Sequence, residues 1–144
     1  MANIVEFLTA RLDEDEQLAK AAAVKAAGSP VYGSPDSTGK WRATNDGVFA
    51  DTEYTNSPFV VDGYGFLADE IGAHIARHDP AHVLTEVTAK RLLLVMYERC
   101  VRDVDARPPV FGSASQMQIL WHLVRAAAAV YDQHPDFNPA WRVE

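Results

Sequence analysis

The sequence predicts a helix-rich α+β protein: one long N-terminal helix, a small three-stranded antiparallel meander, and then three helices. Two long stretches, 3–27 and 80–102, repeat apolar residues at the 3.6-residue period of a helix. Between them, short runs rich in aromatic and β-branched residues flank Asp46-Gly47, a dipeptide that favours a hairpin. At 144 residues the chain is long enough to bury a core as a single domain, 1–144.

The N-terminal helix is expected to run from Asn3 to about Ala27. Asn3 can cap it, because Glu6 follows at the spacing of a capping box, and Gly28 suits the left-handed residue that stops a helix. Four apolar residues are predicted to share its buried face: Ile4, Leu8, Leu18 and Ala22.

A connection rich in Gly, Pro and Ser follows at 28–39, and the sequence leaves open whether it is a lid or a tether. The meander is expected over 40–62, with strands at 40–45, 48–51 and 59–61. An isolated hairpin is marginal in water, so the sheet is expected to lean on the helices.

The stretch from Asp69 to Val101 predicts two helices that meet at His78-Asp79-Pro80. The residue before a proline avoids the helical region, so the first helix, from about residue 66, should end near His78. Asp79 is then a suitable N-cap and Pro80 fits the first helical position of the second helix. Residues 92–97 are apolar all round, which predicts the most buried helical segment of the chain.

The helical part, 66–132, is completed by a helix that begins at Ser113 or Ser115 and ends near Tyr131. Its inward residues are predicted to be Met117, Leu120, Trp121, Val124, Ala128 and Tyr131. The tail, 133–144, holds two prolines and is expected to be extended, with Phe137 and Trp141 docking it onto the body.

The composition limits the environment and the partners. A net charge of −7 argues against nucleic acid, whose phosphates require an excess of Lys and Arg. Cys100 is the single cysteine and cannot form an intramolecular disulfide, which favours a reducing, cytoplasmic setting. No targeting segment and no apolar run of membrane-spanning length is visible, so no membrane partner is expected.

His74 and His78 are the sharpest candidate pair, because imidazoles at i,i+4 on a helix face the same way. The HExxH protease mechanism is excluded, since residue 75 is isoleucine. No cofactor is predicted, and a divalent metal is left open; the further ligands available are Asp79 and His134 first, then His82 and Cys100. The alternative is a pair of partly buried rings with structural roles.

A second constellation combines Arg11, Asp15, Glu86, Lys90 and Arg91. If the first helix packs against the long central one, Asp15 should meet Lys90 or Arg91. The set is then either an interhelical salt-bridge network or a pocket for a small anion or a partner's acidic group. Trp41 is a further binding candidate, either in a stacking surface for a nucleotide or peptide or in the core beneath the sheet.

Three blocks of the sequence, FLTARLDEDEQLAKAA, HIARHDPAHVLTEVTAKR and DQHPDFNPAW, resemble an uncharacterised family from actinobacteria and their phages. His82 departs from that resemblance, because arginine is expected there. The resemblance implies a host range and a common fold, and it brings no activity.

Two functions remain. The leading hypothesis is a non-enzymatic, regulatory interaction protein that acts on a host factor or on itself as a homodimer. It rests on the acidic charge and on the lack of a phosphate loop, a nucleophile elbow, a CxxC pair or an EF-hand loop. The alternative is a protein that binds a metal or a small ligand at His74, His78 and Asp79. If it is an enzyme, hydrolysis is the expected reaction.

Overall fold

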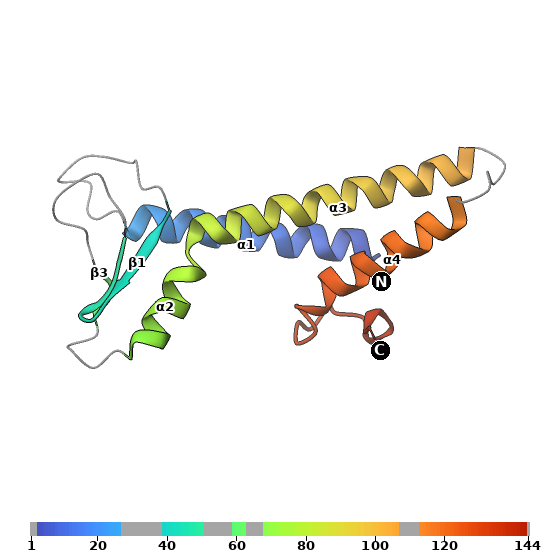
Figure 1. The fold of residues 1–144 in the computed structure, drawn as a ribbon. Coiled ribbons are helices and arrows are strands. Elements are labelled where there is room, and N and C mark those ends of the chain that lie inside the picture. Colours follow the sequence, from blue (N-terminus) through green and yellow to red (C-terminus); the bar gives the residue numbers. More distant parts are fainter. Residues whose placement is uncertain (1–2, 27–38, 51–58, 63–67, 107–112, 144) are drawn as a thin grey trace. The chain divides into compact units, whose positions relative to one another are not determined.

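The computed structural model describes residues 3–26, 39–50, 59–62, 68–106 and 113–143 and has the predicted α+β architecture (Figure 1). Its elements, in order, are α1 (Ile4–Ala26), β1 (Trp41–Thr44), β2 (Gly47–Ala50), β3 (Phe59–Asp62), α2 (Asp69–Arg77), α3 (Pro80–Ala106), α4 (Ser113–Ala129) and the short 3₁₀ helix η2 (Pro139–Trp141). The predicted loop up to residue 38 lies outside the described residues. The helix predicted from about residue 66 begins at Asp69, after the extended N-cap residue Ala68. The helix predicted to end near residue 102 continues to Ala106.

The chain divides into two compact units. The first unit holds residues up to Asp13 and from Val87 onward, and the second unit holds Glu14–Glu86. The first therefore contains the start of α1, most of α3, α4 and η2, and the second contains the sheet and α2.

The start of α1 confirms the predicted capping box. The backbone N–H of Glu6 donates to Asn3 Oδ1 at 2.9 Å, and the backbone N–H of Asn3 donates to Glu6 Oε2 at 3.1 Å. Two of the helix's otherwise unpaired N–H groups are satisfied in this way.

The predicted buried stripe of α1 is wrong at one position. Ile4 and Leu8 are buried and Ala22 is half-buried, but Leu18 is 72% exposed and Ala19 is buried in its place. At about 100° per residue, Ala19 lies about 20° from Leu8 around the helix, whereas Leu18 lies about 80° away.

In the second unit the three strands form the predicted antiparallel meander, in the order β1-β2-β3. Thr44 pairs with Gly47, so the two turn residues are Asn45 and Asp46, one position earlier than predicted. Gly47 opens β2 with a φ of 151°, which side-chain-bearing residues rarely adopt. The glycine therefore serves the entry into β2, directly after the two turn residues.

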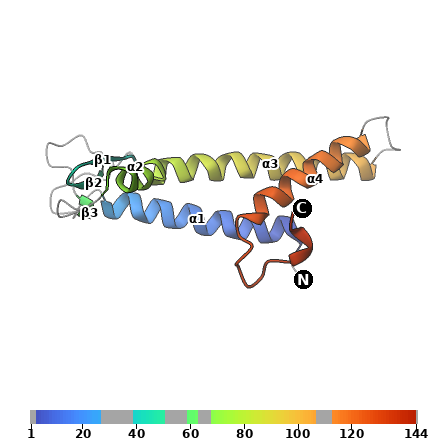
Figure 2. The same ribbon diagram turned by 60° about the horizontal axis from the view of Figure 1, so that its bottom comes forward.

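The junction of α2 and α3 lies beside the first strand (Figure 2). Asp79 caps α3 as predicted, because its Oδ1 accepts the backbone N–H of His82 at 2.7 Å. Its Oδ2 accepts the backbone N–H of Trp41 at 3.1 Å. The carbonyl of Gly39, whose φ is +69°, accepts the N–H of Ala81 at 3.0 Å. One carboxylate thus caps a helix and holds the start of β1.

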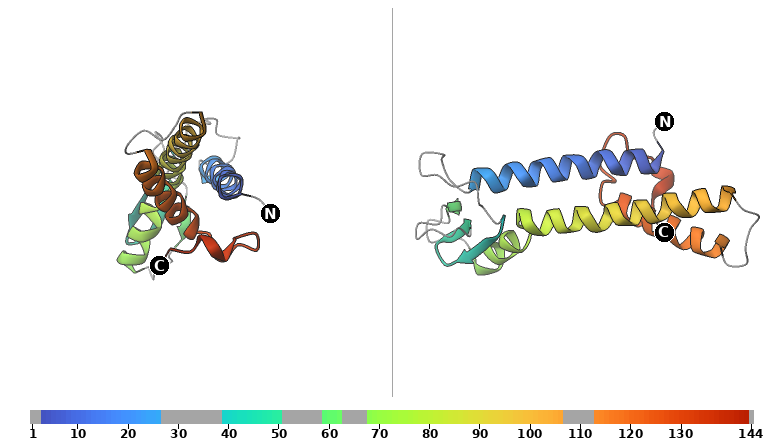
Figure 3. Two further views of the ribbon diagram at one scale, coloured as in Figure 1. Left: turned by 90° about the vertical axis from the view of Figure 1, so that its right-hand side faces the viewer. Right: turned by 90° about the horizontal axis from the view of Figure 1, so that it is seen from above.

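In the first unit α4 runs back along α3 and the tail turns beneath it (Figure 3). Phe7 lies at the centre, with ring centroids 5.2 Å from Trp141 and 5.9 Å from Phe137. Both tail residues are buried, which confirms the predicted docking. The predicted extended form of the tail is wrong, because Pro139–Trp141 form η2 after a series of turns. The remaining buried apolar residues of this unit are Ile4, Leu8, Leu12, Val87, Leu94, Cys100, Leu120, Val124 and Ala128.

The prediction that residues 92–97 form the most buried helical segment is wrong. Leu94 is buried, but Leu92, Val95 and Met96 are 60%, 56% and 49% exposed. An apolar run that continues round the helix does not specify which side is covered, and only the side of α3 that carries Leu94 is covered.

None of the helices within the described ranges is long and apolar enough to span a bilayer.

Candidate functional site

The three histidines at the α2–α3 junction form a row of neighbouring rings. The centroids of His74 and His78 are 4.6 Å apart, and those of His78 and His82 are 5.5 Å apart. All three residues are exposed, so the interpretation of His74 and His78 as partly buried rings is wrong. His82 Nε2 also lies 3.5 Å from Glu86 Oε1.

Asp79 is committed to the backbone. Its two oxygens accept the N–H groups of His82 and Trp41. Among the described residues, no group of three or more His, Cys, Asp or Glu side chains is placed to hold a metal ion. A metal site therefore stays a prediction, and the neighbouring rings of His74 and His78 are what supports it.

His134 belongs to the first unit, where it links the tail to α1. Its Nε2 contacts Nη1 of Arg11, and its Nδ1 lies 3.1 Å from the backbone N of Asp136. Arg11 is buried, with its guanidinium carbon 5.6 Å from the centre of the Phe7 ring. The two residues hold the tail against the helix, which is a structural role for both.

The predicted charge constellation takes a different form within the first unit. Arg91 Nη2 lies 2.7 Å from Oδ1 of Asp13, two residues before the predicted Asp15. Lys90 Nζ lies 5.9 Å above the ring of Tyr131. Asp15 belongs to the second unit, and its predicted pairing stays a prediction.

Trp41 contributes through its backbone. Its N–H donates to Asp79, while its indole Nε1 is buried and has no hydrogen-bond partner among the described residues. Nothing in this geometry presents the ring as a stacking surface, so its binding role stays a prediction.

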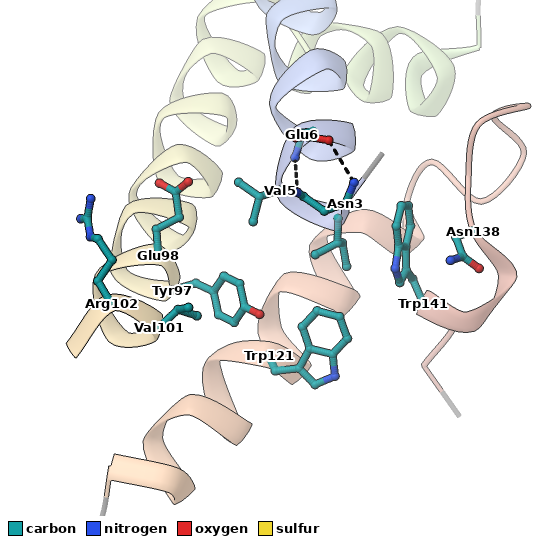
Figure 4. Close-up of a pocket in the computed structure, with 11 residues that line it drawn as sticks. Asn3, Val5, Glu6, Tyr97, Glu98, Val101, Arg102, Trp121, Asn138 and Trp141 are labelled. Carbon is teal, nitrogen blue, oxygen red and sulfur yellow. Dashed lines mark hydrogen bonds between the residues drawn. The ribbon is translucent and has the colours of Figure 1, made fainter. Parts of the chain in front are cut away.

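The first unit contains a pocket of about 690 Å³ that the sequence did not predict (Figure 4). The start of α1, the later half of α3, α4 and the tail all contribute to it. Its lining residues are Asn3, Ile4, Val5, Glu6, Tyr97, Glu98, Val101, Arg102, Trp121, Asn138 and Trp141. A smaller pocket of about 350 Å³ lies beside Arg11 and the tail.

Aromatic rings dominate the larger pocket. Tyr97 projects from α3 toward Trp121 of α4, with ring centroids 6.0 Å apart and planes at 32° (Figure 4). Burial raises the pKa of the Tyr97 hydroxyl above 10.0, and the nearby Cys100 adds to this effect. Trp121 and Trp141 were predicted to point inward. Each indole carries a polar N–H group that needs a partner in the interior, and this was the available sign that the two rings line a pocket.

Large apolar side chains are exposed on both long helices of the first unit. On α4, Ile119 and Leu123 are 61% and 49% exposed, Ala126 is exposed, and Val130, the residue after the helix, is 64% exposed. Spacings of four and three residues place the first three on one side of α4, and together with Val130 we call them the α4 stripe. Leu92, Val95 and Met96 form a second exposed cluster, which we call the α3 stripe.

These features define a helix-rich α+β protein with an aromatic-lined pocket. Residues 1–143 match the model of a family of unknown function, DUF6221, and the chain belongs to that family. No curated protein matches the chain. No solved structure matches it either.

Proposed function

We propose that this protein is a non-enzymatic interaction protein whose partner is a second copy of itself. The observation that carries the proposal is the pair of exposed apolar stripes on α3 and α4. Six side chains of this size at these exposures present on the order of 500 Å² of apolar surface in total, within the range of the largest, often functional, apolar patches of monomers.

The geometry of the α4 stripe favours another helix as its occupant. A spacing of alternating four and three residues is the seam of a coiled-coil-type contact. A second copy supplies the same stripe, so a two-fold pair is self-complementary. If both stripes were covered, the pair would bury on the order of 1,000 Å², near the lower limit of a specific interface. We therefore expect a weak, concentration-dependent dimer.

Sedimentation velocity over a micromolar-to-millimolar range tests the proposal. The wild-type protein should shift from monomer to dimer as its concentration rises. The double variant Ile119→Lys, Leu123→Lys should stay monomeric, because burying two ammonium groups in the seam is unfavourable.

Leu18→Lys is the matched control, because Leu18 is a 72% exposed leucine of α1 outside both stripes. It should dimerise like the wild type. A wild-type protein that remains monomeric over the whole range would overturn the proposal, as would a lysine double variant that still dimerises.

The environment is part of the same proposal. Cys100 is a free, buried thiol, and the resemblance of three sequence blocks points to actinobacteria and their phages. Both features support action in the reducing cytoplasm of such a host. Fractionation of cells that express the protein, followed by immunoblotting, tests this location; recovery from the culture medium would contradict it.

A second candidate function is divalent-metal binding at His74 and His78. The 4.6 Å separation of two exposed rings supports it, since imidazole is the commonest protein ligand for zinc, copper and nickel. Metal content should be measured for the purified protein and for the double variant His74→Ala, His78→Ala. Stoichiometric metal that the variant loses would support the site, and equal metal content in both proteins would remove it.

A further inference from the structure

We propose that the pocket between the start of α1, α3, α4 and the tail binds an organic cation, an ammonium group attached to an apolar body. This binding site is independent of self-association. It rests on the aromatic walls, the charge at the pocket and the polar atoms that the fold leaves unused.

The walls suit a cation with an apolar body. Tyr97, Trp121 and Trp141 line the pocket from three different parts of the chain. The faces of Trp and Tyr rings carry negative potential and attract a desolvated ammonium group, most strongly when it is methylated. A volume of about 690 Å³ exceeds what a small ammonium ion fills, so the ligand needs a body that contacts the remaining rings.

The charges at the pocket favour the same class of ligand. Glu6 and Glu98 supply two carboxylates, whereas Arg102 supplies one guanidinium. The positive end of the α1 dipole is already compensated, because the side chains of Asn3 and Glu6 accept each other's backbone N–H groups. Glu98 is an exposed residue of α3 that lines the pocket and directly follows Tyr97 in the chain (Figure 4), so its carboxylate adds negative charge to the pocket.

The polar tips of the rings remain available. Within the described part of the chain, the Tyr97 hydroxyl and the indole N–H groups of Trp121 and Trp141 form no hydrogen bond. None of the three is among the buried polar atoms that lack a partner, so water reaches them in the free protein. A ligand with a hydroxyl or ether oxygen in its body would take the place of that water.

Choline and its uncharged isostere 3,3-dimethylbutan-1-ol test the charge requirement, because they share shape and hydroxyl and differ in the nitrogen. Benzyltrimethylammonium tests the contact with a larger apolar body. Binding is followed by ¹H–¹⁵N NMR of the three indole N–H groups, each assigned by its Trp→Phe variant. Trp41 lies in the other unit and outside the pocket, so its indole serves as an internal reference.

The expected result is saturable shifts of the Trp121 and Trp141 signals with choline and with benzyltrimethylammonium, and no shift of Trp41. The neutral isostere should bind about tenfold more weakly or not at all. Glu98→Gln should weaken choline binding about fivefold, while Glu70→Gln, which removes an exposed carboxylate of α2, should leave it unchanged. Trp121→Leu should weaken it about tenfold. A well-resolved Trp141 indole signal at its wild-type position in the ligand-free variant shows that the unit holding the pocket keeps its fold.

Equal binding of choline and the neutral isostere would overturn the proposal, because the pocket would then select shape and not charge. Shifts that include Trp41 to the same extent, or an absence of saturable shifts with both cations, would overturn it as well. The measurement does not depend on dimerisation, since it can be made at concentrations where the protein is monomeric.

Discussion

The Asp79→Ala substitution should destabilise the second unit strongly, because one carboxylate serves two elements. Oδ1 caps α3 through the N–H of His82, and Oδ2 holds the N–H of Trp41 at the start of β1. Alanine removes both acceptors and leaves the part-buried N–H of Trp41 without a partner.

The magnitude follows from the two contacts. Loss of an N-cap costs about 1 kcal/mol, and an unsatisfied part-buried N–H costs about 1–3 kcal/mol. The free energy of unfolding should therefore fall by about 2–4 kcal/mol. Asp79→Asn separates the contributions, because its amide oxygen can still cap α3 while its NH₂ group faces the N–H of Trp41. It should lose only the larger, second part.

Urea unfolding gives the total change, and amide hydrogen exchange gives its location. The amides of Trp41 and His82 should lose protection in Asp79→Ala, whereas Asp79→Asn should expose chiefly the Trp41 amide. Asp105→Ala is the matched control, since Asp105 is an exposed carboxylate on α3, and it should change the free energy of unfolding by less than about 0.5 kcal/mol. If Asp79→Ala unfolds like this control, the double role assigned to the carboxylate is refuted.

Three further predictions concern single side chains. Because the pKa of Tyr97 is raised above 10.0 in the folded protein, the phenol of the unfolded chain ionises first as the pH rises. The associated stability is therefore present below pH 10.0 and is lost as the pH passes through the raised pKa. In urea unfolding at several alkaline pH values, the free energy of unfolding should fall more steeply for the wild type than for Tyr97→Phe, and parallel curves would contradict the raised pKa. Arg91→Ala should cost less than about 1 kcal/mol at low salt and less still at high salt, since its pair with Asp13 is about half exposed; a larger loss in salt-dependent thermal unfolding would show that the pair is not a surface interaction. Gly39→Ala should lower the free energy of unfolding, measured in urea, by about 1–2 kcal/mol, because φ is +69° and a Cβ atom would lie 3.2 Å from the backbone N of Ala81. A wild-type free energy of unfolding in this variant would show that the turn tolerates a side chain.

Local sequence determined the element boundaries that carry a cap, because helix caps depend on residues a few positions apart. The Asn3–Glu6 capping box and the Asp79-Pro80 start of α3 were predicted correctly for this reason. The three-stranded meander was predicted from its turn dipeptide and β-forming residues, with the turn misplaced by one residue.

The candidate site was harder to predict, because its parts come from distant stretches of chain. Tyr97, Trp121 and Trp141 were each predicted to point inward, and no feature of their neighbouring residues indicates that they line one pocket. Asp13 shows the same limit, since its pairing with Arg91 depends on how α1 packs against α3. Two acids two residues apart point in different directions from a helix, and the sequence does not choose between them.

The sequence by itself determined the class of fold, the starts of α1 and α3, and the docking of the tail through Phe137 and Trp141. The tertiary structure alone decided which side of each helix is covered. Leu92, Val95 and Met96 are as apolar as Leu94, yet only Leu94 is buried. Burial depends on the neighbour that a residue meets, whereas hydropathy is a property of the residue alone.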